Sequence, residues 1–337
     1  MSGSDNTIVA GVSRVLQDRL PPGWATEKVA RSGSAPLVRI TSQEGRSAEF
    51  VVVVFSHPYP RSASLLPRER PLLVAAPYLS RAVRDVIEGE GASYADETGN
   101  VRIVLGEPGL FITTSGADSN PWPRARQFTL RGAKAGRVVC SLVQSAAPIG
   151  VRELAGMADT DPGYVSRLLG MLDSEAIVDR DPRGAVLQVH WRKLLTRWSE
   201  EAPLENRAKS STWLAPRGMR SLWDGLRKVD FPYLITGSAA AYEIAPVAPA
   251  RLASIYVEDP EEVARKLGLV NAPAGANVQL LEPEERTIFD RADTRNSLRY
   301  APLPLIVADL LSGPGRSPAE AEALMEWMDI NAEAWRG

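Results

Sequence analysis

The sequence predicts a multidomain α/β protein in which two α/β domains flank a helical centre. Its 337 residues are enough for two or three domains of ordinary size. Two breaks divide the chain, one at 115–127 that holds Pro121 and Pro123, and one at 200–212. Short β-branched runs lie before the first break and after the second, whereas apolar residues between them follow helical spacing. We therefore expect three domains, at 1–123, 124–206 and 207–337.

The composition excludes several classes of protein. With 44% hydrophobic and 24% charged residues, the chain has the composition of a globular protein. A single cysteine, Cys140, excludes an internal disulfide, a cysteine zinc finger and a CxxC redox pair. With only His57 and His190, a histidine-rich metal site is not expected, and we expect no cofactor. There is neither a signal-peptide pattern nor an apolar run of the ~20 residues that span a membrane, so we expect a cytoplasmic protein.

Alternating apolar spacing and β-branched runs predict a mixed α/β first domain. The expected helices lie at Ile8–Leu20 and Leu79–Glu88, and the expected strands at Leu37–Ile40, Glu49–Phe55, Leu72–Ala75, a run ending at Tyr94, and Val101–Leu105. A turn at Asp96–Asn100, which contains Gly99, joins the last two strands.

The central region predicts three helices followed by a β-hairpin. The expected helices are Gly136–Val143, Val151–Ala158 and Gly163–Glu175, and the expected strands are Ile177–Arg180 and Ala185–Val189. In the third helix Val165, Leu168, Leu169 and Leu172 point inward, with either Thr160 or Asp161 as its cap and Pro162 at its start. This order of elements is that of a winged helix-turn-helix.

The charge distribution favours a nucleic-acid partner for the central region. From Arg124 to Trp198 there are 12 Lys or Arg residues against 7 Asp or Glu residues, whereas the flanking parts are near neutral before it and acidic after it. The whole chain has a net charge of −2, so its positive charge is concentrated in one domain. That asymmetry is expected where one module makes the phosphate contacts.

The third helix would enter the major groove of duplex DNA with its N-terminal residues at the base edges. Arg167 could pair with guanine, and Tyr164 and Ser166 could reach a phosphate or a base. Arg180 and Arg183 in the hairpin would approach the minor groove or the backbone. The predicted DNA-binding residues are Thr160, Gly163, Tyr164, Ser166, Arg167, Arg180 and Arg183. The acidic residues Asp159, Asp161, Asp179 and Asp181 beside them would weaken binding, and a winged helix used only for protein contacts is the alternative.

Residues 130 to 337 resemble a family of actinobacterial winged-helix proteins. The stretches that carry the resemblance include IGVRELAGMADTDPGYVSRLLGMLDSEAIVDRDPRG, TWLAPRGM, YLITGSAAAYEIAPVAPARLASIYVEDP and DLLSGPGRSPAEAEALMEWM. These proteins are grouped with AbiEi-like antitoxins of type IV toxin–antitoxin systems. The resemblance implies a DNA-binding winged helix followed by a domain related to nucleotidyltransferases, the two serving autorepression and toxin neutralisation.

Neither outer domain carries a complete catalytic pattern. Thr236–Ser238 is similar to the loop that opens a nucleotidyltransferase site, but the next strand, Arg251–Val257, lacks the two carboxylates that would hold magnesium. The first domain loosely resembles a restriction-endonuclease-like fold in which Glu49 could open an active site. The following strand at Leu72–Ala75 has neither an acid nor a lysine, and Asp96 is expected in a turn. We therefore expect both domains to be inactive and the protein not to be an enzyme.

Near the C-terminus, Gly313–Met328 predicts a Gly/Pro turn followed by a helix. Ser317 is expected to cap this helix and Arg316 to anchor the loop through an ion pair. Trp327 and Trp335 are expected to lie in the core or in an interface.

The function predicted from the sequence is that of a sequence-specific regulator of transcription that binds double-stranded DNA, as a homodimer. The first alternative is an antitoxin that regulates its own gene and binds a nucleotidyltransferase toxin through the acidic C-terminal domain. A weaker alternative is a metal-dependent nuclease.

Overall fold

The computed structural model describes residues 3–29, 36–56, 58–64, 66–67, 71–122 and 128–336. His57 and residues 123–127 of the first predicted break lie outside these ranges. The chain forms two compact units, one of Met1–Gln127 with Ser174–Ala176 and the other of Phe128–Asp173 with Ile177–Gly337. A boundary therefore falls close to the predicted one at 123/124. The further boundary predicted at 206/207 stays a prediction, and the second unit is described as a whole.

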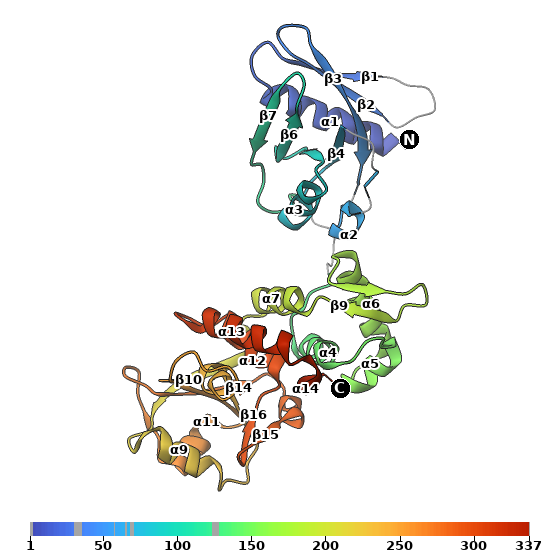
Figure 1. Ribbon diagram of the computed structural model, residues 1–337. Coiled ribbons are helices and arrows are strands. Elements are labelled where there is room, and N and C mark those ends of the chain that lie inside the picture. The colour runs from blue at the N-terminus through green and yellow to red at the C-terminus, as the bar shows by residue number, and fades with distance from the viewer. Residues whose placement is uncertain are drawn as a thin grey trace. The chain divides into compact units, whose positions relative to one another are not determined.

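The first unit is a seven-stranded sheet whose strands follow one another in chain order (Figure 1). They are β1 (Ala25–Val29), β2 (Leu37–Thr41), β3 (Ser47–Val54), β4 (Leu72–Ala76), β5 (Ser93–Asp96), β6 (Val101–Leu105) and β7 (Leu110–Thr114). The central strands β3, β4 and β5 are parallel, and the outer pairs are antiparallel. The predicted strands are confirmed, whereas β1 and β7 were not predicted. Most residues of β1 are polar, and the apolar run of β7, Leu110–Ile112, is short and includes the exposed Phe111.

Helices cover both faces of this sheet. They are α1 (Gly3–Arg19), α2 (Pro60–Ala63) and α3 (Arg81–Gly89). Side chains of β4 alternate between two cores, because successive residues of a strand point to opposite faces. Leu73 packs with α1, whereas Leu72 and Val74 pack with α2 and α3. The buried strand β4 is therefore apolar throughout, as a strand covered on both faces must be.

The second unit begins with the helices and the hairpin that the sequence predicts. They are α4 (Ala133–Gln144), α5 (Val151–Met157), α6 (Pro162–Ser174), β8 (Val178–Arg180) and β9 (Val186–Val189). Helix α7 (Trp191–Glu201), which was not predicted, follows them. The predicted inward residues of the third helix are confirmed, since Val165, Leu168, Leu169 and Leu172 are all fully buried. The predicted ends coincide with the observed ones or differ from them by at most three residues.

A second seven-stranded sheet follows, with the order β13-β10-β14-β12-β11-β16-β15. Its strands are β10 (Ala208–Leu214), β11 (Tyr233–Thr236), β12 (Ala253–Val257), β13 (Val270–Asn271), β14 (Val278–Pro283), β15 (Asp293–Arg295) and β16 (Leu298–Tyr300). The accompanying helices are α8 (Leu204–Arg207), α9 (Gly218–Leu226), α10 (Gly237–Tyr242), α11 (Pro260–Leu267), the 3₁₀ helix η1 (Arg286–Arg291), α12 (Leu303–Leu311), α13 (Ser317–Ile330) and α14 (Ala332–Trp335).

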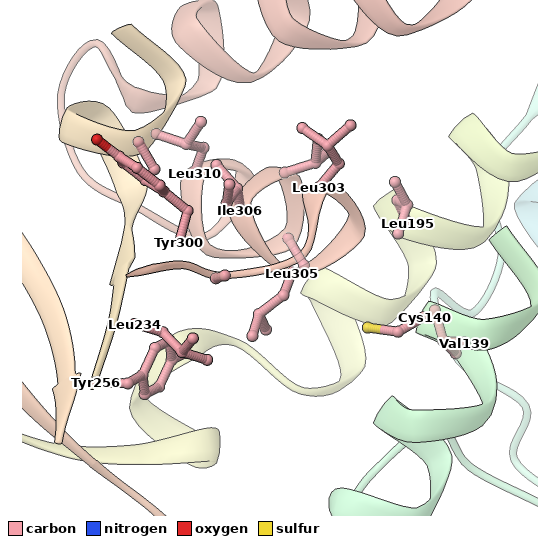
Figure 2. Close-up of a cluster of buried hydrophobic side chains, with 14 of the residues drawn as sticks. Val139, Cys140, Leu195, Leu234, Tyr256, Tyr300, Leu303, Leu305, Ile306 and Leu310 are labelled. Atoms are coloured by element: carbon pink, nitrogen blue, oxygen red, sulfur yellow. The ribbon is translucent and has the colours of Figure 1, made fainter. Parts of the chain in front are cut away.

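Helix α12 joins the helices of the second unit to its sheet. Every residue from Leu303 to Leu310 is buried, so the helix is enclosed on all sides. It contacts α4 and α7 as well as α10, α13 and β11. Figure 2 shows Cys140 of α4 and Leu195 of α7 beside this helix, with Tyr256 of the sheet near Leu305. One continuous core therefore serves both the helices at 133–201 and the sheet.

The region around α13 corrects one prediction and confirms two. Arg316, not Ser317, occupies the N-cap position, and no side chain caps the helix, so the prediction of a Ser317 cap is wrong. The predicted ion pair of Arg316 is confirmed, because its Nε lies 2.7 Å from Glu320 Oε1. Trp327 and Trp335 pack, partly buried, against the core as expected. No helix in the described ranges is long and apolar enough to cross a membrane.

Candidate nucleic-acid interface

Helix α6 divides into a buried face and an exposed face. While its apolar side chains lie in the core, Gly163, Ser166 and Arg167 are exposed. Of the two caps that the sequence left open, the structure selects Asp161, whose Oδ1 accepts a hydrogen bond of 2.7 Å from the backbone N–H of Tyr164. Thr160 is partly buried, and its hydroxyl has no hydrogen-bond partner within the described chain.

An aromatic contact orients two of the predicted DNA-binding side chains. Tyr164 is partly buried, with its ring centroid 5.3 Å from that of Phe128, and burial raises its pKa above the ordinary value of a tyrosine. The guanidinium carbon of Arg167 lies 5.7 Å from the centroid of the same Phe128 ring, which is within the range of a cation–π interaction. The sequence analysis missed Phe128, because it follows the first break and belongs to no periodic segment.

The hairpin uses one of its two predicted arginines internally. Arg180 Nε donates to the carbonyl oxygen of Gly184 at 3.0 Å, and Gly184 has a left-handed φ of 94° that the tight turn requires. Arg183, in the turn itself, is exposed. Of the predicted pair, Arg183 therefore has the more accessible side chain, and Arg180 also holds the shape of the turn.

The acidic residues near this surface have structural partners. Asp161 caps α6, and Asp181 Oδ1 accepts a hydrogen bond of 2.8 Å from the N–H of Ala185 in the hairpin turn. Asp179 Oδ2 lies 3.3 Å from Nε2 of His190. The negative charge that the sequence places beside the exposed face thus belongs largely to groups that shape the turns.

Two arginines from outside α5 and α6 hold the turn between these helices. Arg137 of α4 donates to the carbonyl oxygens of Ala158 at 3.0 Å and of Asp159 at 3.3 Å. Arg291 of η1 donates to the carbonyl oxygen of Met157 and to Ser141 Oγ. Asp159 adopts a left-handed φ of 45°, which is uncommon outside glycine. These contacts connect the turn before α6 to the segment that follows β14.

Arg137 also forms an ion pair with Glu285, which immediately precedes η1. We refer to Arg137, Glu285 and Arg291 as the turn clamp. Because Arg137 is largely buried and Glu285 is half exposed, the pair is partly shielded from solvent. The sequence analysis missed the clamp, since Arg137 is 148 positions from Glu285 and 154 from Arg291 in the chain.

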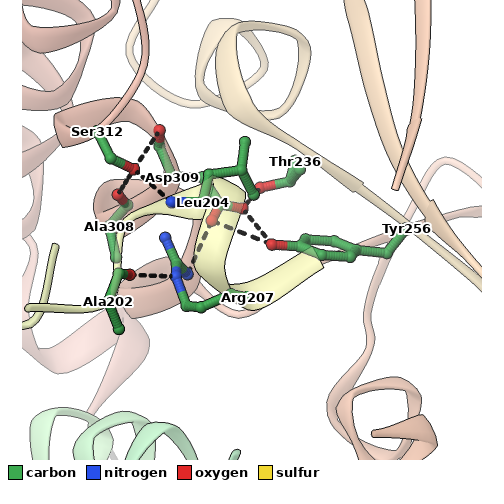
Figure 3. Close-up of polar contacts among 8 residues, drawn as sticks. All are labelled: Ala202, Leu204, Arg207, Thr236, Tyr256, Ala308, Asp309 and Ser312. Atoms are coloured by element: carbon green, nitrogen blue, oxygen red, sulfur yellow. Dashed lines mark hydrogen bonds and ion pairs between the residues drawn. The ribbon is translucent and has the colours of Figure 1, made fainter. Parts of the chain in front are cut away.

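A buried polar cluster lies beneath the sheet of the second unit (Figure 3). The carboxylate of Asp309 in α12 is 2.8 Å from Arg207 Nη1, and it accepts hydrogen bonds from Thr236 Oγ1 at 2.5 Å and from the Tyr256 hydroxyl at 3.1 Å. Burial raises the pKa of Asp309 above its ordinary value, and the charge of Arg207 opposes that shift. Arg207 also lies over the Trp198 ring, at 4.9 Å from its centroid.

The loop that is similar to a nucleotidyltransferase loop is engaged in structural contacts. Gly237 has a φ of 61°, and Ser238 donates a hydrogen bond to Glu320 of α13. On β12, Ser254 Oγ donates to Gln279 at 2.9 Å, and Tyr256 donates to Asp309. The side chains at these two alternate positions of the strand therefore carry a hydroxyl and a phenol. Magnesium-dependent nucleotidyl transfer would require carboxylates at such positions.

The candidate acids of the first unit are engaged as well. Glu49 Oε1 lies 2.7 Å from Arg39 Nη2 on the adjacent strand. Asp96 ends β5 and also opens the predicted turn, because its carbonyl oxygen accepts a hydrogen bond of 3.2 Å from the N–H of Gly99. Its fully buried carboxylate accepts hydrogen bonds from the backbone N–H groups of Leu79, Thr98 and Asn100. In the part of the chain that the structure describes, no three His, Cys, Asp or Glu side chains are grouped to hold a metal ion.

Comparison with known families gives one match. Residues 188–328 match a family described as transcriptional regulator, AbiEi antitoxin, type IV TA system. The predicted resemblance to AbiEi-like antitoxins is confirmed for this segment. It runs from the end of β9 into α13, so the AbiEi-like segment contains the sheet of the second unit and Glu285 and Arg291 of the turn clamp. Helices α4, α5 and α6 precede it. No curated protein and no solved structure matches the chain.

Proposed function

We propose that residues 128–190 form a winged helix-turn-helix and that the protein uses it to regulate transcription by binding a specific site in duplex DNA. The observation that carries the proposal is the division of α6, whose apolar side is buried while Gly163, Ser166 and Arg167 are exposed. A helix fits the major groove of B-form DNA, and an arginine there can bind both acceptors of a guanine. Arg183 in the hairpin adds a second exposed cation next to this helix in the chain.

A measurement of DNA binding tests the proposal. Fluorescence anisotropy would compare a duplex from the promoter of the protein's own gene with a scrambled duplex, across a salt series. We expect Arg167→Ala to weaken binding to the promoter by ~1–3 kcal/mol, and Arg167→Lys to keep the salt dependence while losing most of the preference for the promoter. Arg265→Ala, which removes an exposed arginine of α11, is the matched control. Equal binding of both duplexes by the parent would refute sequence-specific recognition.

The family match favours a second candidate function, that of an antitoxin. We propose that the AbiEi-like segment would then carry the neutralising activity, because the match covers it and not α6. The neighbouring gene would be expressed alone and together with this protein. The antitoxin function would be supported if the neighbouring gene arrests growth when expressed alone, and if both the parent protein and the Arg167→Ala variant relieve that arrest. A neighbour without effect on growth would leave the regulator as the preferred function.

We further propose that the protein is not an enzyme, with a degenerate restriction-endonuclease-like first unit and a degenerate nucleotidyltransferase-like domain after residue 207. The engagement of Glu49 with Arg39 and the absence of carboxylates from β12 support this proposal. Incubation with plasmid DNA and magnesium tests the weaker alternative of a nuclease. Cleavage that Glu49→Gln abolishes would overturn the proposal.

Homodimer formation, which would match a two-fold operator, is also proposed and would be measured by light scattering.

A further inference from the structure

A small pocket adjoins the turn clamp. It has a volume of about 90 Å³ and lies between α4 and α7 on one side and β12, η1 and α12 on the other. Apolar and aromatic side chains form much of its lining, among them Cys140, Trp198, Tyr256, Ile288 and Leu305. Cys140, Trp198, Tyr256 and Leu305 are buried, whereas Gly132, Glu284 and Glu285, which also line the pocket, are exposed and mark its mouth. The pocket thus leads from the surface into the core that joins the helices to the sheet.

The three arginines of the lining hold other groups of the protein. Arg137 pairs with Glu285, Arg207 pairs with Asp309, and Arg291 donates to Met157 O and Ser141 Oγ. Arg137 and Arg207 thus have acidic partners, whereas Arg291 holds neutral acceptors. A ligand carboxylate or phosphate would face Glu284 and Glu285 at the mouth. An uncharged ligand loses no ionic hydration on entry, and it gains from contact with the apolar lining.

Arg137 and Arg291 connect the pocket to the α5–α6 turn. Both line the pocket, and both hold carbonyl oxygens of residues 157–159, which lead into α6. A ligand that packs better against these side chains when the hydrogen bonds are formed would stabilise that conformation. The shift in the conformational equilibrium of the turn is limited by the difference between the ligand's affinity for this conformation and its affinity for the others.

We propose that this pocket is an effector site for a small, uncharged, mainly apolar organic molecule, of the size of a single ring, and that its occupation stabilises the turn before α6. Binding to the pocket and ordering of the turn do not depend on DNA. A consequent change in DNA affinity rests on the proposed function.

Benzene is the probe for the site, because a closed apolar cavity of about 150 Å³ binds it, and this pocket of about 90 Å³ is smaller but open at its mouth. Benzene should raise the thermal midpoint of the full-length protein by about 2–4 °C, and sodium benzoate at the same concentration should not. Cys140→Leu, which fills the floor of the pocket, should abolish the response, whereas Cys140→Ala should preserve it. Ala133→Phe narrows the mouth at a partly exposed position and provides a second blocking variant if Cys140→Leu does not fold.

Hydrogen exchange tests the connection to the turn. With benzene bound, amides in residues 157–165 should exchange at least about threefold more slowly, and amides of α3 in the first unit should not change. The effect should be absent from a folded blocking variant. In the DNA assay, benzene should change the affinity of the parent by at least about threefold.

Four results would overturn the inference: no benzene response in the parent, an equal response in the blocking variants, stronger binding of benzoate, or unchanged exchange at 157–165 with benzene bound. Slower exchange in a protein that binds no DNA would support the pocket and its link to the turn, and it would refute only the proposed function.

Discussion

At the scale of single residues, Asp309 and Arg207 form a charged pair inside the core of the second unit. The Asp309 side chain is 1% exposed and the Arg207 side chain 12%, so neither charge can be hydrated if its partner is removed. Thr236 and Tyr256 also donate hydrogen bonds to the Asp309 carboxylate, and these bonds fix its orientation toward Arg207. The pair joins α12 to the end of α8, and the bonds from Thr236 and Tyr256 join it to the sheet.

Removing one partner of this pair should destabilise the protein strongly. Arg207→Met is expected to lower the free energy of unfolding of the second unit by ~3–5 kcal/mol, because it leaves Asp309 buried without a counter-charge. Arg207→Met with Asp309→Leu should recover part of that loss, since the double variant buries no lone charge. Urea denaturation of the parent, both single variants and the double variant measures the effect. If the stability losses of the two single variants simply add in the double variant, the interaction between Arg207 and Asp309 would be contradicted.

Cys140 gives a second prediction at this scale. Complete burial raises the pKa of its thiol to about 12, and the thiolate is the species that reacts with alkylating reagents. At pH 8 we expect iodoacetamide to label the native protein at least about a hundredfold more slowly than the protein in urea. Because this is the only cysteine of the chain, the intact mass reports the reaction directly. Comparable rates would show that the thiol is accessible in the native state.

At the scale of elements, the start of α6 combines a stabilising cap with an unfavourable charge for DNA. Asp161→Ala should lower the stability by ~0.5–2 kcal/mol, because the N–H of Tyr164 loses its acceptor. Asp161→Asn should keep the stability, because asparagine caps equally well. If α6 binds DNA, Asp161→Asn should also bind it more tightly, because it removes a negative charge from the helix N-terminus.

Thermal unfolding and DNA binding of both Asp161 variants test this prediction. Asp259→Asn, which makes the same change at the N-cap of α11, outside the proposed DNA-binding elements, is the matched control. An Asp161→Ala variant as stable as the parent would show that the cap contributes nothing. A loss of DNA affinity in a stable Asp161→Asn variant would show that this aspartate itself contacts the ligand.

At the scale of the whole molecule, the second unit has one core that extends from α4 and α6 through α12 into the sheet. We therefore expect 128–337 to fold and to unfold in a single transition, and 128–206 to remain largely unfolded, because α4 and α7 would lose their contacts with α12. Circular dichroism and calorimetry of the two fragments make the comparison. A stable, cooperative 128–206 fragment would contradict the prediction.

The sequence by itself predicted the elements that follow from local rules. The helical spacing of Val165, Leu168, Leu169 and Leu172 predicted which side of α6 is buried, because periodicity is a property of a segment alone. The strands β3 and β4 were predicted from β-branched and apolar runs, which are likewise properties of a segment alone. The family resemblance was also visible in the sequence, and the match of residues 188–328 confirms it. The positions of α6 that lie outside this apolar spacing were predicted to form its exposed face.

Only the tertiary structure decided which distant groups meet. Arg137 and Arg291 hold the same turn, and Asp309 lies against Arg207, although each pair is separated by more than 100 positions. The same structure selected Asp161 over Thr160 as the cap and engaged Arg180 within its own hairpin. No local pattern encodes such contacts, because hydrogen bonds and ion pairs depend on positions in space, and those positions are determined by how α12 packs between the helices and the sheet.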